Sequence, residues 1–380
     1  MNLELTSEQL AIRDTVREFA ASEIAPAAAH HDRTREFPYE NVRKCAALNL
    51  MGIMAAEEYG GSALDTVSYT LVIEELSRAC ASTGVIVSVN NSLFIHPVEA
   101  FGTEEQKRRF LPPHAKGEKI GCYCLSEPNA GSDAGNQQTT AVSQGDGYVL
   151  NGTKNFITNG VAADTALVFA ATDRAKKHHG ITAFLVEKGT AGFRLGKDEV
   201  KLGITSSGSV EMVFEDCFVP AANRLGAEGA GFKIAMNTLD GGRIGIAAQA
   251  VGITRAVLEE STAYSRQRKA FGKPIGEFQA IQFMLADMAM ELDAARLLTH
   301  RAAWTKDQGG RYSMEASQAK LFASETAMRA AVKGVQIFGG YGYMNEYPME
   351  RYFRDAKITE IYEGTSEIQR LVIAGNLLKD

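Results

Sequence analysis

The sequence predicts an α+β fold in which a sheet domain lies between two helical domains. Residues 1–118 carry apolar side chains at helical spacing, and residues 119–228 carry short β-rich runs separated by turn pairs. The helical period returns in long pieces over residues 229–380. Because the strands gather in the middle, an alternating doubly wound sheet is disfavoured. We therefore expect an N-terminal all-helical domain, a central antiparallel β-barrel and a C-terminal four-helix bundle, with these bounds.

The first domain contains recognisable helix start and stop signals. Thr6-Ser7-Glu8-Gln9 is a capping-box pattern, and Pro26 is expected to stop the helix that it opens. Pro112-Pro113 is expected to end the last helix of this domain. Between these points the periodicity predicts helices at about 40–54, 63–82, 85–101 and from Thr103 onward.

Glycine-containing turn pairs organise the middle of the chain. They are Gly145-Asp146-Gly147, Asn151-Gly152 and Asn159-Gly160, and each is typical of a hairpin. The β-rich runs around them fall at 120–125, 148–150, 155–158, 166–170, 181–186 and 210–214. The C-terminal bundle is predicted from helices at about 230–264, 277–305, 312–338 and 365–377.

Composition excludes several classes of protein. The net charge of −6 disfavours a nucleic-acid partner, and no apolar window is long enough to span a membrane. The five cysteines are scattered and the seven histidines offer no ligand pair, so we expect no metal site. The N-terminus lacks a secretory signal, and the odd cysteine number fits a reducing compartment. We predict a cytoplasmic location, or the mitochondrial matrix if a transit peptide has been removed.

The most informative stretch is Tyr362-Glu363-Gly364, which follows the glycine-rich run Phe338–Tyr343. An aromatic neighbour can desolvate a carboxylate and raise its pKa, and a glycine lets a backbone N–H approach a ligand closely. Together they could abstract a proton next to a carbonyl group. For this stretch alone, a loop glutamate beside a turn glycine is the simpler interpretation.

Two segments of the middle domain could bind a flat cofactor. Tyr123–Asp133 reads as a strand end followed by a loop with two hydroxyls and free backbone donors, suited to a heterocycle and a phosphate. Asn151–Gly160 reads as a hairpin that presents an aromatic ring and a hydroxyl. A turn-rich β loop and an ordinary hairpin are the alternatives.

Two further segments carry charge in the C-terminal domain. Asp240-Gly241-Gly242-Arg243 superficially resembles a dinucleotide fingerprint, but that motif requires a preceding strand and the residues before it read as helix. Asp240 and Arg243 would lie one helical turn apart, able to meet a polar ligand or simply to pair with each other. Ser265–Pro274 is a basic loop that could clamp a pyrophosphate or remain a solvated charge run.

The order and spacing of these segments identify the chain as similar to the acyl-CoA dehydrogenases, most closely the short-chain (butyryl-CoA) members. The resemblance covers essentially the whole chain. The motifs that carry it are Ser88–Leu93, Leu125–Asp133, Asn151–Gly160, Arg268–Gly272, Gln336–Gly342 and Ile361–Arg370.

The resemblance implies FAD, held without a covalent bond in a homotetramer that is a dimer of dimers. The loop that would contact the flavin contains Tyr123, Leu125, Ser126, Gly131 and Ser132. Phe156, Ile157 and Thr158 would pack on the isoalloxazine, where many relatives have a tryptophan in place of Phe156. From the adjacent subunit, the cofactor would be reached by Arg268, Phe271, Phe278, Gln279, Gln336, Ile337, Gly339 and Gly340. Thr365 and Glu367 would lie on the cofactor side of the catalytic loop.

The implied reaction is α,β-dehydrogenation of an acyl-CoA to the trans-2-enoyl-CoA, a step of fatty acid β-oxidation. Glu363 would take the α-proton while the β-hydrogen leaves as hydride to flavin N5. The Glu363 N–H and a hydroxyl of the flavin ribityl chain would stabilise the enolate. An electron-transferring flavoprotein would accept the electrons. Substrate contacts are expected from Ser132, Asp240, Arg243, Tyr362 and Gly364.

The resemblance also limits the alternatives. Some relatives carry the base at the position of Gly242, which here has no carboxylate, so Glu363 is favoured. Where some medium-chain relatives have an arginine that contacts CoA, this chain has Gly375. The substrate could still be a branched short-chain or medium-chain thioester. The chain length of 380 residues disfavours the longer flavin oxidases of the same fold. The presence of Glu363 disfavours a flavin monooxygenase. The intact flavin motifs disfavour a catalytically idle flavoprotein or scaffold.

Overall fold

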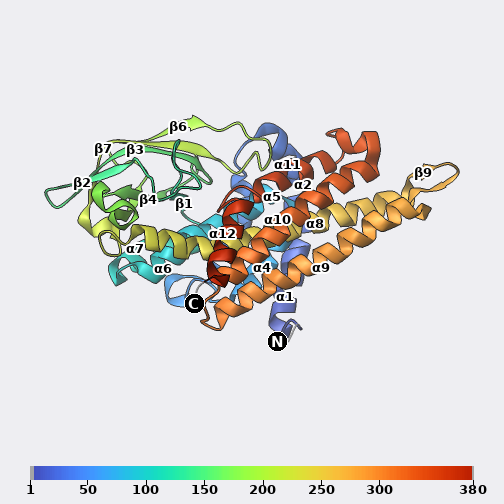
Figure 1. The fold of residues 1–380 in the computed structure, drawn as a ribbon, viewed down its shortest axis with the longest axis horizontal. Coiled ribbons are helices and arrows are strands. Elements are labelled where there is room, and N and C mark those ends of the chain that lie inside the picture. Colours follow the sequence, from blue (N-terminus) through green and yellow to red (C-terminus); the bar gives the residue numbers. More distant parts are fainter. Residues whose placement is uncertain (1–3, 379–380) are drawn as a thin grey trace.

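The computed structural model describes residues 4–378, arranged as two layers of helices with a sheet at one end (Figure 1). Thr6 caps the first helix through the predicted capping box: Thr6 Oγ1 accepts the Gln9 N–H at 3.2 Å, and Gln9 Oε1 accepts the Thr6 N–H at 3.0 Å. The helices of the N-terminal part are α1 (Ser7–Phe19), α2 (Ala25–Thr34), α3 (Tyr39–Ala47), α4 (Thr66–Ala79), α5 (Ala81–Ser88), α6 (His96–Phe101) and α7 (Glu104–Ala115).

Three prolines, at two places in the chain, do not stop helices where the sequence predicted. A π-helical turn, Ala20–Ile24, carries the chain from α1 into α2, and Pro26 lies in the first turn of α2. The π-helical turn just before Pro26 is a local irregularity of the kind that accommodates a proline within a continuous helix. Pro112 and Pro113 lie inside α7, which continues to Ala115 because Lys116 N–H still bonds Pro112 O at 3.1 Å.

The middle part is a sheet whose strands are joined in the order β6-β7-β3-β2-β4-β5-β8, with β1 beside β4. Most pairings are antiparallel, as predicted, but β1 and β2 each pair parallel to β4. Among residues 4–378 no pairing joins β6 to β8, so backbone hydrogen bonds do not close the sheet into a barrel. The strands are β1 (Gly121–Cys124), β2 (Thr140–Gln144), β3 (Gly147–Ile157), β4 (Thr165–Ala171), β5 (Ile181–Glu187), β6 (Phe193–Asp198), β7 (Val210–Pro220) and β8 (Arg224–Leu225).

Of the glycine pairs, Gly145-Asp146 forms the expected turn between β2 and β3. The prediction of a turn at Asn151-Gly152 is wrong, because this pair lies inside β3 at a shift in register against β7. Gly152 has φ +151°, and a Cβ there would lie 2.4 Å from Thr139 Oγ1. The glycine therefore serves a bulge and a close backbone approach rather than a hairpin.

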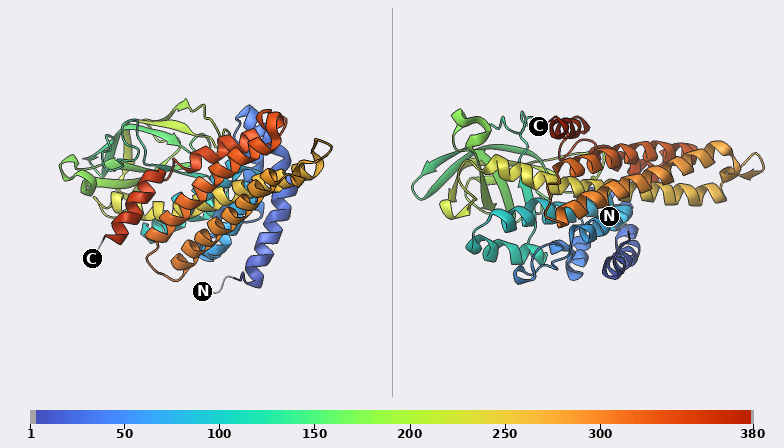
Figure 2. Two further views of the ribbon diagram at one scale, coloured as in Figure 1. Left: turned by 45° about the vertical axis from the view of Figure 1, so that its right-hand side comes forward. Right: turned by 60° about the horizontal axis from the view of Figure 1, so that its bottom comes forward.

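The C-terminal part is built on three long antiparallel helices that cover the N-terminal helices (Figure 2). The predicted helices all occur, and a further one, α11, follows Pro348. A two-strand hairpin of β9 (Lys269–Ala270) and β10 (Lys273–Pro274) forms the tip farthest from the sheet (Figure 1). The helices are α8 (Gly231–Gln267), α9 (Gln279–Asp307), α10 (Ser313–Phe338), α11 (Met349–Thr359) and α12 (Ser366–Leu377). Within residues 4–378, no helix combines the length and apolar character needed to cross a membrane.

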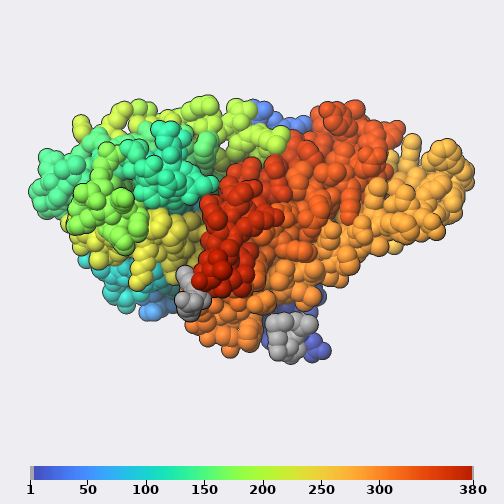
Figure 3. Space-filling view, in the orientation of Figure 1, coloured from blue at the N-terminus to red at the C-terminus, as the bar shows by residue number. Residues whose placement is uncertain are grey.

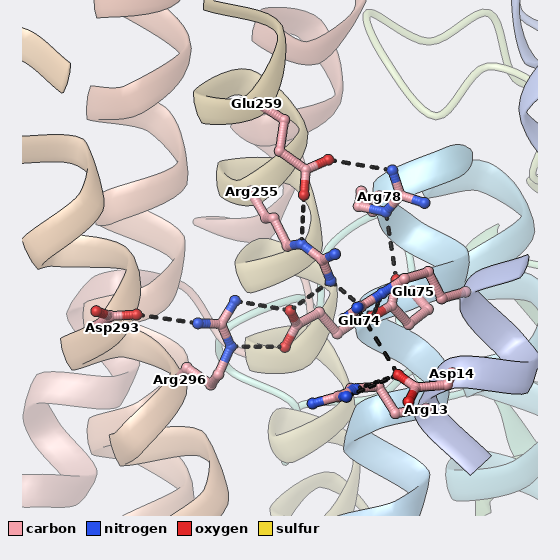
Figure 4. A network of polar contacts seen from close by, with 10 residues as sticks. Arg13, Asp14, Glu74, Glu75, Arg78, Arg255, Glu259, Asp293 and Arg296 are labelled. Atoms are coloured by element: carbon pink, nitrogen blue, oxygen red, sulfur yellow. Dashed lines mark hydrogen bonds and ion pairs between the residues drawn. The ribbon is translucent and has the colours of Figure 1, made fainter. Parts of the chain in front are cut away.

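A buried ionic network joins the two helical layers (Figure 4). Glu74 and Glu75, adjacent on α4, are both buried. Arg296 of α9 forms two hydrogen bonds with Glu74, at 2.9 and 3.1 Å, and Arg255 of α8 lies 2.7 Å from Glu75. Burial alone would raise the pKa of Glu74, but the hydrogen bonds and charge of Arg296, with the charge of Arg255, outweigh it and lower that pKa. Arg17 of α1 completes the network at 2.9 Å from Glu75.

Candidate active site

A cavity of about 370 Å³ lies where the sheet meets α8 and the turn before α12. Figure 3 shows the C-terminal segment, in dark red, lying between the sheet and the other helices. Val89 and Leu93, from the motif Ser88–Leu93, also line the cavity. Phe232, Met236 and Leu239 of α8 line it too, and no motif pointed to these three residues. The predicted site residues that the cavity brings together are Tyr123, Leu125, Ser126, Gly131, Ser132, Phe156, Ile157, Thr158, Arg243, Tyr362, Glu363 and Gly364.

Most of the other predicted cofactor contacts lie at the opposite end of the helical bundle. Arg268, Ile337, Gly339 and Gly340 line a second cavity of about 560 Å³. Beside it, Phe271 projects from the hairpin with 96% of its surface exposed. Gln279, Gln336 and Phe278 start or end helices in the same region, and Thr365 and Glu367 instead begin α12 beside the first cavity. One chain therefore carries two separate groups of predicted cofactor contacts.

The turn that bears Glu363 has an unusual backbone that its neighbours hold in place. Glu363 has φ +53° and Gly364 has φ +97°, in the left-handed region that side chains other than glycine rarely adopt. Lys320 Nζ donates to Gly364 O at 2.7 Å. Gln369 Nε2 donates to Glu363 O at 3.2 Å and to Gly364 O at 2.9 Å, and Arg243 Nε approaches Glu363 O at 3.4 Å. Tertiary contacts thus stabilise a conformation that the sequence alone would disfavour.

The carboxyl group of Glu363 has poorly solvated surroundings. Its Oε2 atom is buried and has no hydrogen-bond partner among residues 4–378. Burial raises the pKa of Glu363 to about 8, although the positive charges of Lys320 and Arg243 oppose the shift. Once ionised, a carboxyl group with a raised pKa is a stronger base than an ordinary carboxylate and can accept a proton from a weaker acid. Among the same residues, the backbone N–H of Glu363 has no acceptor, which leaves it available to a ligand.

Gly242 lies directly against this carboxyl group. A Cβ at residue 242 would lie 2.1 Å from Glu363 Oε2 and 2.7 Å from Leu93 Cδ2. On the same helix, Arg243 Nη1 donates to Asp240 Oδ1 at 2.7 Å. Arg243 lines the cavity, whereas Asp240 does not and accepts a hydrogen bond from Ser313. The structure thus shows the intrahelical pair, and only the arginine of that pair faces the cavity.

A second buried ion pair fixes the loop after β1 against β3. Lys154 Nζ donates to Glu127 Oε1 at 2.8 Å, to Gln137 Oε1 at 2.9 Å and to Leu125 O at 3.2 Å. Lys154 and Glu127 are both buried, so their charges satisfy each other in a poorly solvated region. Each lies within a motif that the sequence singled out, but their contact could not be inferred from either motif.

The residues around the cavity fit a flavin. Phe156 presents a ring that is 64% exposed at the cavity, from a backbone with φ +62°. An exposed aromatic ring on a strained backbone is typical of a platform for a flat ligand. Thr158 and the glycine-containing loop Leu125–Ser132 add polar groups beside it. Among residues 4–378, no cluster of His, Cys, Asp and Glu side chains is placed to hold a metal ion.

The chain matches the models of one known family along most of its length. Residues 6–118 match the N-terminal domain of acyl-CoA dehydrogenase, residues 122–217 the middle domain and residues 229–378 the C-terminal domain. The chain is 54% identical to the short-chain specific acyl-CoA dehydrogenase of Clostridium acetobutylicum over the full length of both. It is 53% identical to the mitochondrial short-chain specific enzyme of Mus musculus, covering all of this chain and 92% of that protein.

Solved structures show the same fold. Butyryl-CoA dehydrogenase from Megasphaera elsdenii superimposes with a TM-score of 0.98 at 49% identity, covering both chains fully. A chain in the structure described as "Electron transferring flavoprotein of Acidaminococcus fermentans" gives a TM-score of 0.99 at 51% identity, again over both full chains. The three-domain fold that the motifs predicted is confirmed. This chain belongs to the acyl-CoA dehydrogenase family of FAD-dependent oxidoreductases.

Proposed function

We propose that this protein oxidises short-chain acyl-CoA thioesters to trans-2-enoyl-CoA, with Glu363 as the base that removes the α-proton. One observation carries the proposal: Glu363, whose carboxyl oxygen Oε2 is buried and has no partner among residues 4–378, lines a cavity shared with the loop and strand end that fit a flavin. A base raised in pKa by its surroundings, next to a redox cofactor, suits removal of a weakly acidic C–H proton.

Different residues of the chain would bind the cofactor, remove the proton and exclude water. Leu125–Ser132 and Phe156–Thr158 would hold the flavin of their own subunit, and Arg268 and Gly339 would contact that of a neighbour. When bound, FAD supplies the acceptor for the hydride that leaves the β-carbon. Glu363 takes and holds the α-proton, while its free backbone N–H would donate to the thioester oxygen as negative charge develops there. The apolar side chains of Val89, Leu93 and Leu239 would exclude water from the carboxyl group.

The chain length of the substrate is proposed from the relatives. Two relatives, from Clostridium acetobutylicum at 54% identity and from Mus musculus at 53%, are named as short-chain specific acyl-CoA dehydrogenases. A hydrophobic pocket discriminates one methylene by only about 1–3 kcal/mol, so neighbouring chain lengths should react more slowly rather than not at all.

A substrate panel tests this function. Purified holoenzyme, mixed without oxygen with straight C4, C6 and C8 and branched C4 and C5 acyl-CoA, should lose its yellow flavin absorbance fastest with butyryl-CoA. We expect octanoyl-CoA to be at least about 10-fold slower. Fastest reduction by a branched thioester would replace the proposed substrate, and no reduction by any thioester would refute the reaction.

We propose an electron-transferring flavoprotein as the acceptor of the electrons. The support is the match to a chain in the structure described by that name. The alternative of an oxidase has weaker support, since the prolyl acyl carrier protein oxidase AnaB is 35% identical. Rapid reoxidation of the reduced enzyme by molecular oxygen would favour the oxidase.

We also propose that copies of the chain assemble as a homotetramer. On α9, Phe283, Met290, Leu297 and Trp304 recur every seven residues and are 44–66% exposed. A seven-residue apolar repeat forms a continuous seam along a helix, and such a seam is a common site of association between helices. The two separate groups of predicted cofactor contacts, one at each end of the helical bundle, also require a neighbouring copy if they are to meet on one FAD.

The seam predicts the effect of added charge on assembly. The double variant Met290→Glu with Leu297→Glu should dissociate the assembly and lower FAD retention, because burying two carboxylates in an apolar interface is costly. Light scattering and the ratio of flavin to protein measure both effects. Val142→Glu, which places a charge at a 62% exposed valine of β2, is the matched control and should change neither. If the double variant has the same assembly mass in solution as the wild type, the interface does not lie on this face of α9.

A further inference from the structure

We propose that Lys320 of α10 is a positioning residue for the Glu363 base: it holds the turn by its backbone and supplies a buried positive charge that acts on the carboxyl group. This role rests on the proposed function of Glu363. Lys320 does not line the cavity, and no motif pointed to it.

The surroundings of Lys320 are unusual for a lysine. The residue is completely buried, and its ammonium group donates to a neutral carbonyl, Gly364 O, at 2.7 Å rather than to a carboxylate. A buried lysine whose charge is not directly paired is costly to a fold. Its hydrogen bond ends one residue from the base, on the turn with positive φ at both Glu363 and Gly364. The energetic cost of burying this lysine is therefore borne next to the proposed catalytic base.

The electrostatics around this lysine link it to Glu363. The charged groups that act on Lys320 are Glu363 and Glu360 of the turn region, Glu367 of α12 and Arg243 of α8. Burial lowers the pKa of Lys320, and the negative charge of Glu363 is the largest influence that opposes this shift and favours the charged lysine. Conversely, Lys320 is the largest influence that opposes the upward shift of the Glu363 pKa. Removing the lysine charge should therefore move the Glu363 pKa further up.

Holding the turn and supplying charge can be separated by experiment. Gln369, also buried, donates to the same two carbonyls, Glu363 O and Gly364 O, but carries no charge. If Lys320 is removed, Gly364 O still has Gln369 as a donor, so the turn should remain folded. Gln369→Leu is the matched variant, because it removes hydrogen bonds from the turn and leaves the charge unchanged.

The test compares Lys320→Met, Lys320→Arg and Gln369→Leu as holoenzymes. The rate of flavin reduction by butyryl-CoA is measured against pH. In Lys320→Met the acid limb of the profile should move up by about one pH unit, and the rate at pH 7 should fall about 10-fold. Lys320→Arg should return the limb to the wild-type position or below it. Gln369→Leu should lower the rate at every pH without moving the limb.

A spectroscopic titration makes the result independent of turnover. The infrared band of the protonated Glu363 carboxyl, assigned as the band missing in Glu363→Gln, should persist to higher pH in Lys320→Met. An unmoved band, or a pH profile like that of Gln369→Leu, would overturn the role of the charge. A wild-type enzyme that no acyl-CoA reduces would instead refute the proposed function, while the band still tests the coupling between the two groups.

Discussion

Replacing Glu363 with glutamine should slow the reduction of bound FAD by butyryl-CoA about 10³- to 10⁴-fold. The amide cannot accept the α-proton, while its size and buried position are the same. FAD content and thioester binding should remain, because the loop and strand end that fit the flavin do not depend on the Glu363 carboxyl. Anaerobic stopped-flow mixing measures the rate, and equilibrium titration with the product enoyl-CoA measures binding.

Glu325→Gln is the matched control for this change. The Glu325 carboxylate of α10 pairs with Arg370 of α12 and does not line the cavity. The variant therefore replaces a carboxyl group near α12 that lies outside the site. This variant should be reduced at the wild-type rate. A Glu363→Gln enzyme that is reduced as fast as the control would mean that another group removes the proton.

Glu363→Gln should also change how the free energy of unfolding depends on pH. The folded-state pKa of Glu363 is about 8, above its ordinary value of 4.5, so the folded protein binds a proton that the unfolded chain has released. The bound proton of Glu363 contributes fully to the free energy of unfolding below pH 4.5. This contribution is lost as the pH rises to 8, at about 1.4 kcal/mol for each pH unit. Glu363→Gln lacks this loss, so its urea midpoint should exceed that of the wild type increasingly toward pH 8.

Gly242→Ala is also expected to lower the rate of flavin reduction strongly. The added methyl group would lie 2.1 Å from Glu363 Oε2, and the atoms that it meets are the free ends of Glu363 and Leu93. The fold can accommodate the methyl group by moving these ends, but the carboxyl group then leaves its position. Since a displacement of about 1 Å can cost about 100-fold in rate, we expect a loss of that size with FAD binding retained.

Gly241→Ala is a closely matched control on the same helix. Its methyl group would meet nothing nearer than Lys306 Nζ, at 3.7 Å, which is ordinary contact. Both variants should gain a little helix stability, because alanine is favoured over glycine in a helix interior. Measured side by side, equal reduction rates in the two variants would show that the Glu363 carboxyl does not need the space beside Gly242.

Local signals in the sequence predicted the elements that depend on local chemistry. The capping box at Thr6, the turn at Gly145-Asp146 and the long helices follow from hydrogen bonding and periodicity within a few residues. Helix α11 was missed, because its eleven residues follow a glycine- and tyrosine-rich segment that reads as loop. The misplaced turn at Asn151-Gly152 reflects a contact with Thr139 that lies across the sheet.

The site was predicted where family motifs name its residues and missed where distant segments supply support. Glu363 and its glycine neighbour stand out in the sequence, and the cavity contains both. Lys320 reaches them from 43 residues away along the chain, and Lys154 reaches Glu127 across 27 residues. No periodicity reports which of many lysines will be buried against a carbonyl or a carboxylate. Supporting residues of this kind become visible only in three dimensions.

The ionic network of Glu74 and Glu75 limits how this protein can be recombined with its relatives. The acids belong to the N-terminal segment, and two of the bases that neutralise them, Arg255 and Arg296, belong to the C-terminal segment. A chimera that takes one segment from a relative without these arginines would strand a carboxylate in the interior, at about 3–5 kcal/mol. Functional hybrids should therefore be those whose parents share both halves of the network, whatever their overall identity.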